Sequence, residues 1–483
     1  MNDYESIINN SKKAYSDWKK ISVNERINYL KKIRNYIVEN KQEIIDVIKK
    51  DTNKPDVECI MSDIFPTLNL IKYYENKAKK FLKKDKRKTP FEFFRNYSYV
   101  EYEPYGSVLV ISPWNYPFYL SMAPTITALV SGNSVVLKPS EVNPNVGKLI
   151  KKIFNNICLK KDVFQLALGD GNVGEKLIES KPNKIFFTGS VNTGKKIMKK
   201  ASDDLIPVEL ELGGKDAMVV FDDVDLDRVA EGALYGGFAN LGQLCVGVER
   251  VFIQNNLYDD FIEKILNRIK DLNFGSKKFS DIGPFISPKQ KEIVKSQIND
   301  AIKKGAKCHN EFVEKDDYIF PLVLSNVSSN MDVMKNETFG PILPIIKFNT
   351  KDEVIKLVNN SEFGLGASIW TKNIKKAKEI VSELNVGNCY INDVIKNVAN
   401  PDLPFGGNKN SGIGRYHGKE GIMSFVQKKS VMVSKNRLKE INWFPYDKKT
   451  YKLLDKIINI KFKESRLHKK LSDIIYLIKN MFS

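Results

Sequence analysis

The stretch KIFFTGSVNTGKKIM, residues 184–198, passes from a run of apolar residues through a turn with two glycines into a helical pattern. The first part, KIFFTG (184–189), has the apolar character of a buried strand, and TGKKIMKKAS (193–202) has the periodicity of a helix. A strand that runs directly into a helix is the repeating unit of parallel α/β sheets. This stretch therefore predicts an α/β fold.

The same alternation extends along most of the chain. After an N-terminal region with helical patterns, buried strands are predicted at SVLVIS (107–112), NSVVLK (133–138) and DAMVVF (216–221), with a helix at VGKLIKKIFNNI (146–157). The 483 residues are too many for one small core, so we expect two or three interlocked lobes. Beyond residue 245 the alternation continues with RVFIQ, LYDDFIEKILNRIKDL, PILPIIKF, ASIWT and GNCYIND.

The composition excludes several classes of protein. Apolar residues make up 42% of the chain, which is ordinary for a globular protein, and no apolar run is long enough to span a membrane. The polar N-terminus predicts no signal peptide, and the five scattered cysteines fit neither a disulfide framework nor a CxxC zinc or redox motif. We expect a cytoplasmic protein without a metal site. The net charge of +19 is ascribed to surface lysines, and without a nucleic-acid-binding motif we expect no nucleic acid partner.

Two glycine-rich turns compete for the role of a dinucleotide-binding loop. GDGNVG (169–174) matches the GxGxxG pattern, but no acidic residue closes a strand about 20 residues later, as that fingerprint requires. In the second turn, Gly189 and Gly194 bracket a helix start, where backbone N–H groups can hold a phosphate, and Ser190 adds a hydroxyl group. A tight turn without a ligand also explains either motif.

Three polar residues have the chemistry of a catalytic site. Cys245 lies in the glycine-flanked turn GQLCVG, but none of the three histidines is near it in sequence to activate it. Glu211 closes a predicted strand, at the end where α/β folds bind ligands, and Asn115 in SPWNYPF has an amide suited to donate to an oxyanion. Taken alone, each is more simply explained as an inert thiol, a solvated carboxylate or a turn asparagine.

The order of the motifs resembles the aldehyde dehydrogenase superfamily. The similarity covers roughly residues 20–434, and the 34-residue spacing from Glu211 to Cys245 also fits the family. The ordered motifs together are far more specific than any one of them. In chain order they are SPWNYPF (112–118), LKPSE (137–141), FTGSVNTG (187–194), ELGGK (211–215), GQLC (242–245), ETFGP (337–341) and PFGGNKNSGIGR (404–415).

The resemblance implies NAD(P)-dependent oxidation of an aldehyde to a carboxylic acid. Cys245 is then the nucleophile that forms a thiohemiacetal and, after hydride transfer, a thioester. Asn115 and the backbone N–H of Cys245 form the oxyanion hole, and Glu211 activates the hydrolytic water. Relatives that transfer the acyl group to CoA typically lack this glutamate, which disfavours a CoA-acylating enzyme. A non-enzymatic binding or structural member is the other alternative, and it normally lacks the nucleophile.

The resemblance also implies the cofactor-binding residues, with NAD expected and NADP as the alternative. The helix-start turn takes the pyrophosphate through Gly189, Ser190 and Gly194, and GDGNVG becomes an adenine-side loop. Glu141 favours NAD, because a carboxylate accepts both ribose hydroxyls but repels a 2′-phosphate. The remaining expected contacts are Lys138 at the adenine ribose, Glu337 at the nicotinamide ribose with Phe339 nearby, and Trp114 in the dinucleotide cleft.

The implied architecture is a Rossmann-type dinucleotide domain, an α/β catalytic domain and a small β oligomerisation element. We expect residues 1–214 and 413–428 in the dinucleotide domain and 215–412 in the catalytic domain. Residues 96–105 and the strand 429–435 are expected at the contacts of a homodimer or homotetramer. The apolar residues expected at the substrate are Phe118, Tyr119, Leu120 and Ala123.

The extension 436–483 departs from the pattern of many relatives. Residues 435–483 carry 13 Lys or Arg against 5 Asp or Glu. Apolar residues near its end repeat at helical spacing, which predicts an amphipathic helix. This helix either packs on the body or a partner subunit, or contacts an anionic membrane surface, and the tail resembles that of the fatty-aldehyde branch. The repeating residues are Leu467, Leu471, Ile474, Ile475 and Ile478.

Overall fold

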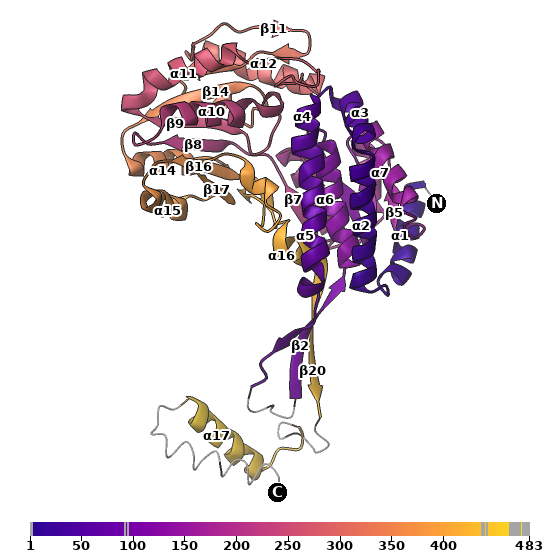
Figure 1. Cartoon of the computed structure of the whole chain (residues 1–483). Coiled ribbons are helices and arrows are strands. Elements are labelled where there is room, and N and C mark those ends of the chain that lie inside the picture. The colour runs from indigo at the N-terminus through magenta and orange to yellow at the C-terminus, as the bar shows by residue number, and fades with distance from the viewer. Residues whose placement is uncertain are drawn as a thin grey trace. The chain divides into compact units, whose positions relative to one another are not determined.

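The computed structural model describes residues 3–90, 93, 96–435, 440, 443–462 and 475. The chain forms two compact units: Met1–Lys83 with Tyr102–Gln427, and Lys84–Glu101 with Lys428–Ser483. The first unit contains two mostly parallel sheets flanked by helices (Figure 1). The α/β fold predicted from the sequence is therefore confirmed.

The first sheet has six strands in the order β19-β7-β6-β3-β4-β5. Neighbouring strands are parallel except β19, which is antiparallel to β7. Every residue of β3 and β4 is buried, as the continuous apolar runs predict for a sheet covered on both faces. The strands are β3 (Ser107–Ile111), β4 (Ser134–Lys138), β5 (Phe164–Leu166), β6 (Lys184–Thr188), β7 (Val208–Glu211) and β19 (Gly412–Ile413).

Helices connect these strands and also form the N-terminal part of the chain. Helix α6 is buried on every side, which its apolar sequence allows, and it begins immediately after Asn115 and Tyr116. A π-helical segment, η1, lies between α4 and α5. The helices are α1 (Asp3–Trp18), α2 (Val23–Glu39), α3 (Lys41–Thr52), α4 (Asp56–Glu58), η1 (Cys59–Ile64), α5 (Phe65–Phe81), α6 (Pro117–Ser131), α7 (Pro144–Asn156), α8 (Gly171–Glu179), α9 (Val191–Ser202) and α16 (Gly418–Ser424).

The second sheet has seven strands in the order β10-β13-β14-β9-β8-β16-β17, parallel except for β10. Its strands are β8 (Asp216–Val220), β9 (Val248–Gln254), β10 (Lys307–Cys308), β13 (Leu322–Ser325), β14 (Ile342–Phe348), β16 (Gly366–Trp370) and β17 (Asn388–Ile391). Its helices are α10 (Leu226–Phe238), α11 (Tyr258–Lys270), α12 (Pro288–Lys303), α13 (Asp332–Lys335), α14 (Lys351–Asn359) and α15 (Ile374–Glu383). Short elements in its loops are η3 (Ala239–Gly242), η4 (Asn255–Leu257), β11 (Glu314–Lys315), β12 (Tyr318–Ile319), β15 (Phe363–Gly364), η5 (Lys396–Ala399) and β18 (Asn408–Lys409).

The loop 212–215 joins the two sheets directly. It leads from Glu211 at the end of β7 to Asp216 at the start of β8. The Cys245 turn lies between α10 and β9, the next strand in the second sheet. The candidate carboxylate therefore lies at the end of a strand of the first sheet, and the candidate thiol lies in a loop of the second.

The second unit contains a small sheet and one helix. The sheet has the order β1-β2-β20 and comprises β1 (Asp85–Arg87), β2 (Asn96–Pro104) and β20 (Val426–Ser434), and the helix is α17 (Lys448–Phe462). The strand expected at 429–435 is therefore present, whereas the functional division into dinucleotide, catalytic and oligomerisation parts stays a prediction. Of the predicted tail helix, only Ile475 is described, with an exposed side chain; Leu467, Leu471, Ile474 and Ile478 lie outside the described residues. Across the described residues, no helix combines the length and apolarity needed to cross a membrane.

Candidate active site

The turn that leads to Cys245 has a strained backbone. Asn240 and Leu241 adopt left-handed φ values of 51° and 57°, which residues other than glycine rarely take. Gly242 follows at 74°, and a Cβ atom there would lie 2.3 Å from the carbonyl oxygen of Gly340, so only glycine fits. Such conformations persist where surrounding contacts hold them, and they cluster at functional sites.

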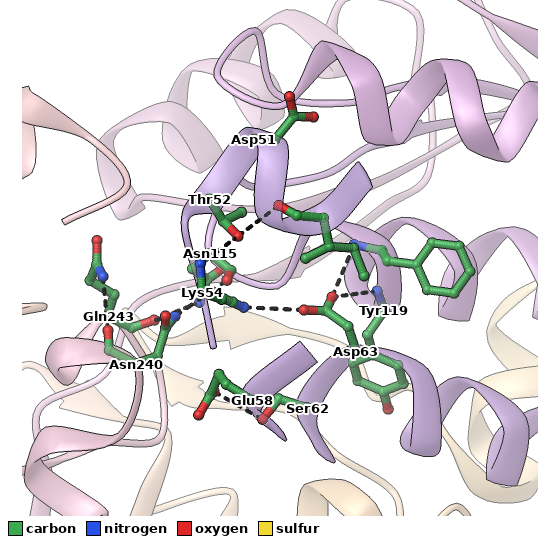
Figure 2. Close-up of polar contacts among 12 residues, drawn as sticks. Asp51, Thr52, Lys54, Glu58, Ser62, Asp63, Asn115, Tyr119, Asn240 and Gln243 are labelled. Atoms are coloured by element: carbon green, nitrogen blue, oxygen red, sulfur yellow. Dashed lines mark hydrogen bonds and ion pairs between the residues drawn. The ribbon is translucent and has the colours of Figure 1, made fainter. Parts of the chain in front are cut away.

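Gln243 holds this turn with its buried side chain. Its Nε2 donates to the carbonyl oxygens of Asn240 at 2.8 Å and Pro284 at 3.2 Å, and its Oε1 accepts from the N–H of Ile286 at 2.9 Å. Its own carbonyl oxygen accepts from Asn240 Nδ2 at 3.2 Å and from Asn115 Nδ2 at 3.1 Å (Figure 2). The network fixes the Asn115 amide beside the cysteine turn, as the sequence analysis expects. The role of Gln243 was not predicted, because its only signal in the sequence is a lone amide two residues before the cysteine.

Glu211 is buried at the end of β7, paired in register with Thr188 and Gly412. Within the described part of the chain, its Oε1 has no hydrogen-bond partner. Burial raises the pKa of Glu211 well above its usual value, and the charge of Glu209 adds to this while Arg415 opposes it. Buried polar atoms without partners are rare in folded proteins, so this carboxyl is a candidate for proton transfer.

Cys245 is only partly exposed, and its thiol has a raised pKa. Burial is the largest cause, followed by the charges of Glu337, Asp216 and Glu211, whereas the N–H of Val246 opposes the shift. The structure thus brings the thiol within electrostatic reach of carboxyl groups on three separate segments. At neutral pH the thiol is protonated, so nucleophilic attack requires a base that removes the proton.

Glu337 lies against the ELGGK loop. Its Oε1 accepts from the N–H of Gly214 at 3.1 Å, and a Cβ atom on Gly213 would lie 2.4 Å from Oε2, so a larger residue there would displace the Glu337 carboxyl. Burial raises the pKa of Glu337 to about 8. Two other predicted cofactor residues also meet: the rings of Trp114 and Phe339 pack edge to face with centroids 5.4 Å apart.

A buried ion pair holds the turn that carries Glu337 and Phe339. Lys215 Nζ donates to Glu249 Oε2 at 2.6 Å and to Thr338 Oγ1 at 2.7 Å. Glu249 also accepts from the backbone N–H groups of Thr338 at 2.8 Å and Phe339 at 2.9 Å. The sequence analysis missed Glu249, because nothing local in VER (248–250) indicates a partner almost 90 residues away.

The predicted adenine-side residues also lie together. Lys138 closes β4, with its Nζ 3.6 Å from Oε2 of the largely exposed Glu141, and burial lowers the pKa of Lys138. Gly174 of GDGNVG lies beside it, since a Cβ atom there would be 3.6 Å from Lys138 Cδ. The Asp170 carboxylate already accepts from the first-turn N–H groups of α8. A phosphate at that helix start would meet a negative charge, which favours the other glycine turn for the pyrophosphate.

That other turn joins β6 to α9. Ser190 is the exposed N-cap of α9, with its Oγ accepting from the N–H of Thr193 at 3.4 Å, and Gly194 lies in the first turn. The N–H of Gly189 donates to the carbonyl oxygen of Glu211 at 3.0 Å. The turn is therefore at the same end of the first sheet as the candidate base.

The expected substrate residues are less accessible than the sequence suggests. Phe118 and Ala123 expose no surface, Leu120 is also buried, and the Tyr119 hydroxyl lies 2.6 Å from His417 Nε2. Tyr116, which the sequence analysis missed, lies closer to the chemistry. Burial raises its pKa well above the usual value, and charges on Glu58, Tyr235, Asp63 and Cys245 add to the shift. No group of three or more potential metal ligands occurs among the described residues.

Comparison with known proteins agrees with this site. The chain matches the aldehyde dehydrogenase family over residues 1–431. It is 43% identical over 443 residues to 4,4′-diapolycopene aldehyde oxidase from Methylomonas sp., covering 91% of this chain and 84% of that protein. It is 33% identical to 4,4′-diaponeurosporen-aldehyde dehydrogenase from Staphylococcus aureus, covering 91% and 95%.

Solved structures give the same assignment. An NAD-dependent aldehyde dehydrogenase from Sinorhizobium meliloti superposes with a TM-score of 0.87 at 31% identity, covering 92% of this chain and 89% of that one. Betaine aldehyde dehydrogenase from Staphylococcus aureus, in complex with NAD+, superposes with a TM-score of 0.85 at 29% identity, covering 92% and 89%. The chain belongs to the aldehyde dehydrogenase family and is an NAD(P)-dependent oxidoreductase that acts on aldehydes.

Proposed function

We propose that this chain oxidises a long, lipophilic aldehyde to the carboxylic acid through Cys245, Asn115 and Glu211. The observation that carries the proposal is the meeting of a partly buried thiol, a fixed amide and a buried carboxyl without a partner. A thiol with a raised pKa needs a base, and a carboxyl with a raised pKa is a stronger base than an ordinary one.

Glu211, directly or through a water, takes the thiol proton, and the sulfur of Cys245 adds to the aldehyde carbon. The Asn115 amide and the Cys245 backbone N–H stabilise the oxyanion of the thiohemiacetal. The carbonyl re-forms as the hydride leaves, which yields a thioester on Cys245. Glu211 releases the thiol proton to solvent, takes a proton from the water that attacks this thioester, and returns that proton to the departing sulfur as the acid is released.

The residues present fit NAD(P)+, which when bound accepts the hydride. Glu337 has a partly buried carboxyl with one oxygen held by Gly214, which suits it to accept from ribose hydroxyl groups. The exposed Glu141 carboxylate beside Lys138 favours NAD, because it would repel a 2′-phosphate. The remaining residues proposed to hold the dinucleotide are Gly189, Ser190 and Gly194 at the pyrophosphate, and Trp114 and Phe339 at the nicotinamide end.

The proposed substrate class rests on an apolar stripe formed by Val57, Ile60, Met61 and Phe65. These side chains are 43% to 56% exposed and recur along α4, η1 and α5 at helical spacing. The stripe adjoins Glu58, whose charge acts on Tyr116, and Cys245 acts on the same tyrosine. Exposed apolar side chains beside a site suit a lipophilic ligand. Two of the relatives are named for 4,4′-diapolycopene aldehyde and 4,4′-diaponeurosporen-aldehyde, and we propose a substrate of that kind for this surface.

The test is NAD(P)H formation at 340 nm with the purified chain. We expect turnover of 4,4′-diaponeurosporen-aldehyde or a long aliphatic aldehyde, without CoA, and none in Cys245→Ala. Val57→Asp with Met61→Asp should raise KM for the long substrate far more than for a short one. Equal preference for acetaldehyde and betaine aldehyde would contradict the substrate class. NADH formation only with CoA would support the acylating alternative, which Glu211 disfavours.

The second unit supports two further proposals about partners. β20 is at an edge of its sheet, a position where a strand of a second copy can be added in a homodimer or homotetramer. On α17, Tyr451, Leu454, Ile458 and Phe462 form one exposed apolar face in a segment rich in lysine, which suits an anionic lipid surface. Light scattering gives the oligomeric state. Salt-sensitive sedimentation with phosphatidylglycerol vesicles, lost in Tyr451→Asp with Ile458→Asp, tests the lipid contact, and unchanged sedimentation of that variant contradicts it.

A further inference from the structure

A buried carboxylate outside the family motifs holds the helix that follows Asn115. Asp63, in the π-helical segment η1, has no exposed surface, and its Oδ1 accepts from the backbone N–H groups of Phe118 and Tyr119, each at 3.0 Å (Figure 2). These N–H groups lie in the first turn of α6, where the helix itself supplies no carbonyl oxygen to accept from them. Asp63 therefore caps α6 from another part of the chain, and its negative charge is favourable at this end of the helix.

Lys54 is the buried counter-charge of this cap. Its side chain is 1% exposed, and its Nζ donates to the other carboxylate oxygen, Asp63 Oδ2, at 3.1 Å. The same Nζ lies 3.9 Å from the centroid of the Tyr116 ring. A buried ammonium that donates to one carboxylate, lies over one aromatic face and interacts with the charge of Glu58 has a narrowly defined position. Lys54 thus touches the residue after Asn115 and, through Asp63, the two residues after Pro117.

The other side of Asn115 is held by the cysteine turn. Its Nδ2 carries two N–H groups, and the bond to the Gln243 carbonyl uses one of them. The orientation of the second N–H then depends on where the backbone places the Asn115 Cα atom. That backbone continues directly into the segment that Lys54 and Asp63 hold.

We propose that Lys54 and Asp63 are positioning residues for Asn115, acting through Tyr116 and the first turn of α6. The proposal rests on the proposed function, in which Asn115 stabilises the oxyanion. The pair touches neither the cysteine nor the residues assigned to the cofactor. Removing the Lys54–Asp63 pair therefore shifts the oxyanion donor without changing the reactivity of the thiol or the affinity for the cofactor.

The decisive experiment is a double-mutant cycle of Lys54→Met and Asn115→Ala, with kcat as the readout. Displacing or removing one oxyanion donor lowers kcat about 10²- to 10³-fold, so we expect Asn115→Ala in that range and Lys54→Met about 10- to 100-fold. In the Asn115→Ala background, Lys54→Met should change kcat less than about threefold, because the group that it positions is absent. KM for NAD+ and the rate of Cys245 alkylation by iodoacetamide should stay within about twofold of wild type, which a general loss of structure would not allow.

Matched variants separate positioning from stability. Arg34→Met removes a partly buried pair with Glu75, 2.7 Å apart and between α2 and α5, and should leave kcat unchanged. Lys54→Arg keeps the cation and should retain most of kcat. If Lys54→Met does not fold, Asp63→Asn takes its place in the cycle, since it keeps an acceptor oxygen but loses the charge. Multiplicative losses in the double variant overturn the positioning role alone. Full kcat in Asn115→Ala overturns the proposed function itself.

Discussion

Glu211 and Glu249 are both buried glutamates of the same site, but their environments are opposite. Glu249 accepts three hydrogen bonds, one from Lys215, with which it forms an ion pair of 2.6 Å, and two from the backbone N–H groups of Thr338 and Phe339. Glu211 has an oxygen without a partner and a strongly raised pKa. A satisfied carboxylate builds the site, and an unsatisfied one is available to move a proton.

The largest effect is expected at the unsatisfied carboxyl. Glu211→Gln keeps the volume but removes the base, so steady-state turnover should fall about 10²- to 10⁴-fold. If the amide blocks only hydrolysis, a single-turnover burst of NADH remains, because the thioester still forms. Stopped-flow absorbance at 340 nm measures both the burst and the steady-state rate. Cys245→Ala is the control, because it should show neither. A variant with normal turnover would remove Glu211 from the mechanism.

The pH profile of the same variant sharpens this comparison. Since burial raises the pKa of Glu211, the carboxylate form becomes populated only as pH rises, and deacylation should accelerate with pH through that range. Glu211→Gln has no such group, so its residual rate should lose this limb of the profile. An unchanged limb would assign the titration to another residue, such as Glu337 with its pKa of about 8.

Glu249, the hydrogen-bonded carboxylate, should respond differently when its partner is substituted. Lys215→Met leaves Glu249 buried without its cation, which costs about 3–5 kcal/mol in the free energy of unfolding. The turn that carries Glu337 then loosens, so NAD+ affinity falls as well. Urea titration and isothermal calorimetry measure the two effects. Lys264→Met is the control, because its 2.9 Å pair with Asp227 is exposed and worth about 0–1 kcal/mol. Equal losses in both variants would contradict a structural role for the buried pair.

The environment of Glu211 could be predicted from the sequence better than that of Glu249. The thiol, Glu211 and Asn115 belong to short local motifs, and strand periodicity places Glu211 at a strand end, so their meeting follows from the topology. The roles of Glu249, Gln243 and Lys54 depend on hydrogen-bond partners elsewhere in the chain and on backbone conformations that no motif encodes. Buried polar networks are specified by three-dimensional packing, and a single sequence has no local signal for them.

The two glycine-rich turns show the same limit of prediction from sequence motifs. GDGNVG matches the dinucleotide pattern letter for letter, yet Asp170 within it caps α8 with a carboxylate. The less regular turn at Gly189 has a neutral serine cap and leaves its helix start without an acidic side chain. The pattern of glycines describes the backbone turn, whereas the charge of the capping residue decides whether the helix start suits a phosphate.

The environment of Asp216 is intermediate between those of Glu249 and Glu211, because, among the described residues, only one of its carboxylate oxygens is hydrogen-bonded. Its substitution should give the smallest of the expected effects. Its Oδ1 accepts from the N–H of Gly366 at 2.8 Å, whereas its Oδ2 is buried without a partner in the described chain, and burial raises its pKa to about 8. Between the ordinary aspartate pKa and that value, the unfolded chain releases a proton that the folded chain keeps, so this residue lowers stability as pH rises. Asp216→Asn retains the acceptor and removes the ionisation. Its free energy of unfolding should exceed that of wild type by about 1–3 kcal/mol at pH 8 and by less at pH 5, as measured by urea titration. A gain that is equal at both pH values would show that Asp216 is not held protonated in the folded chain.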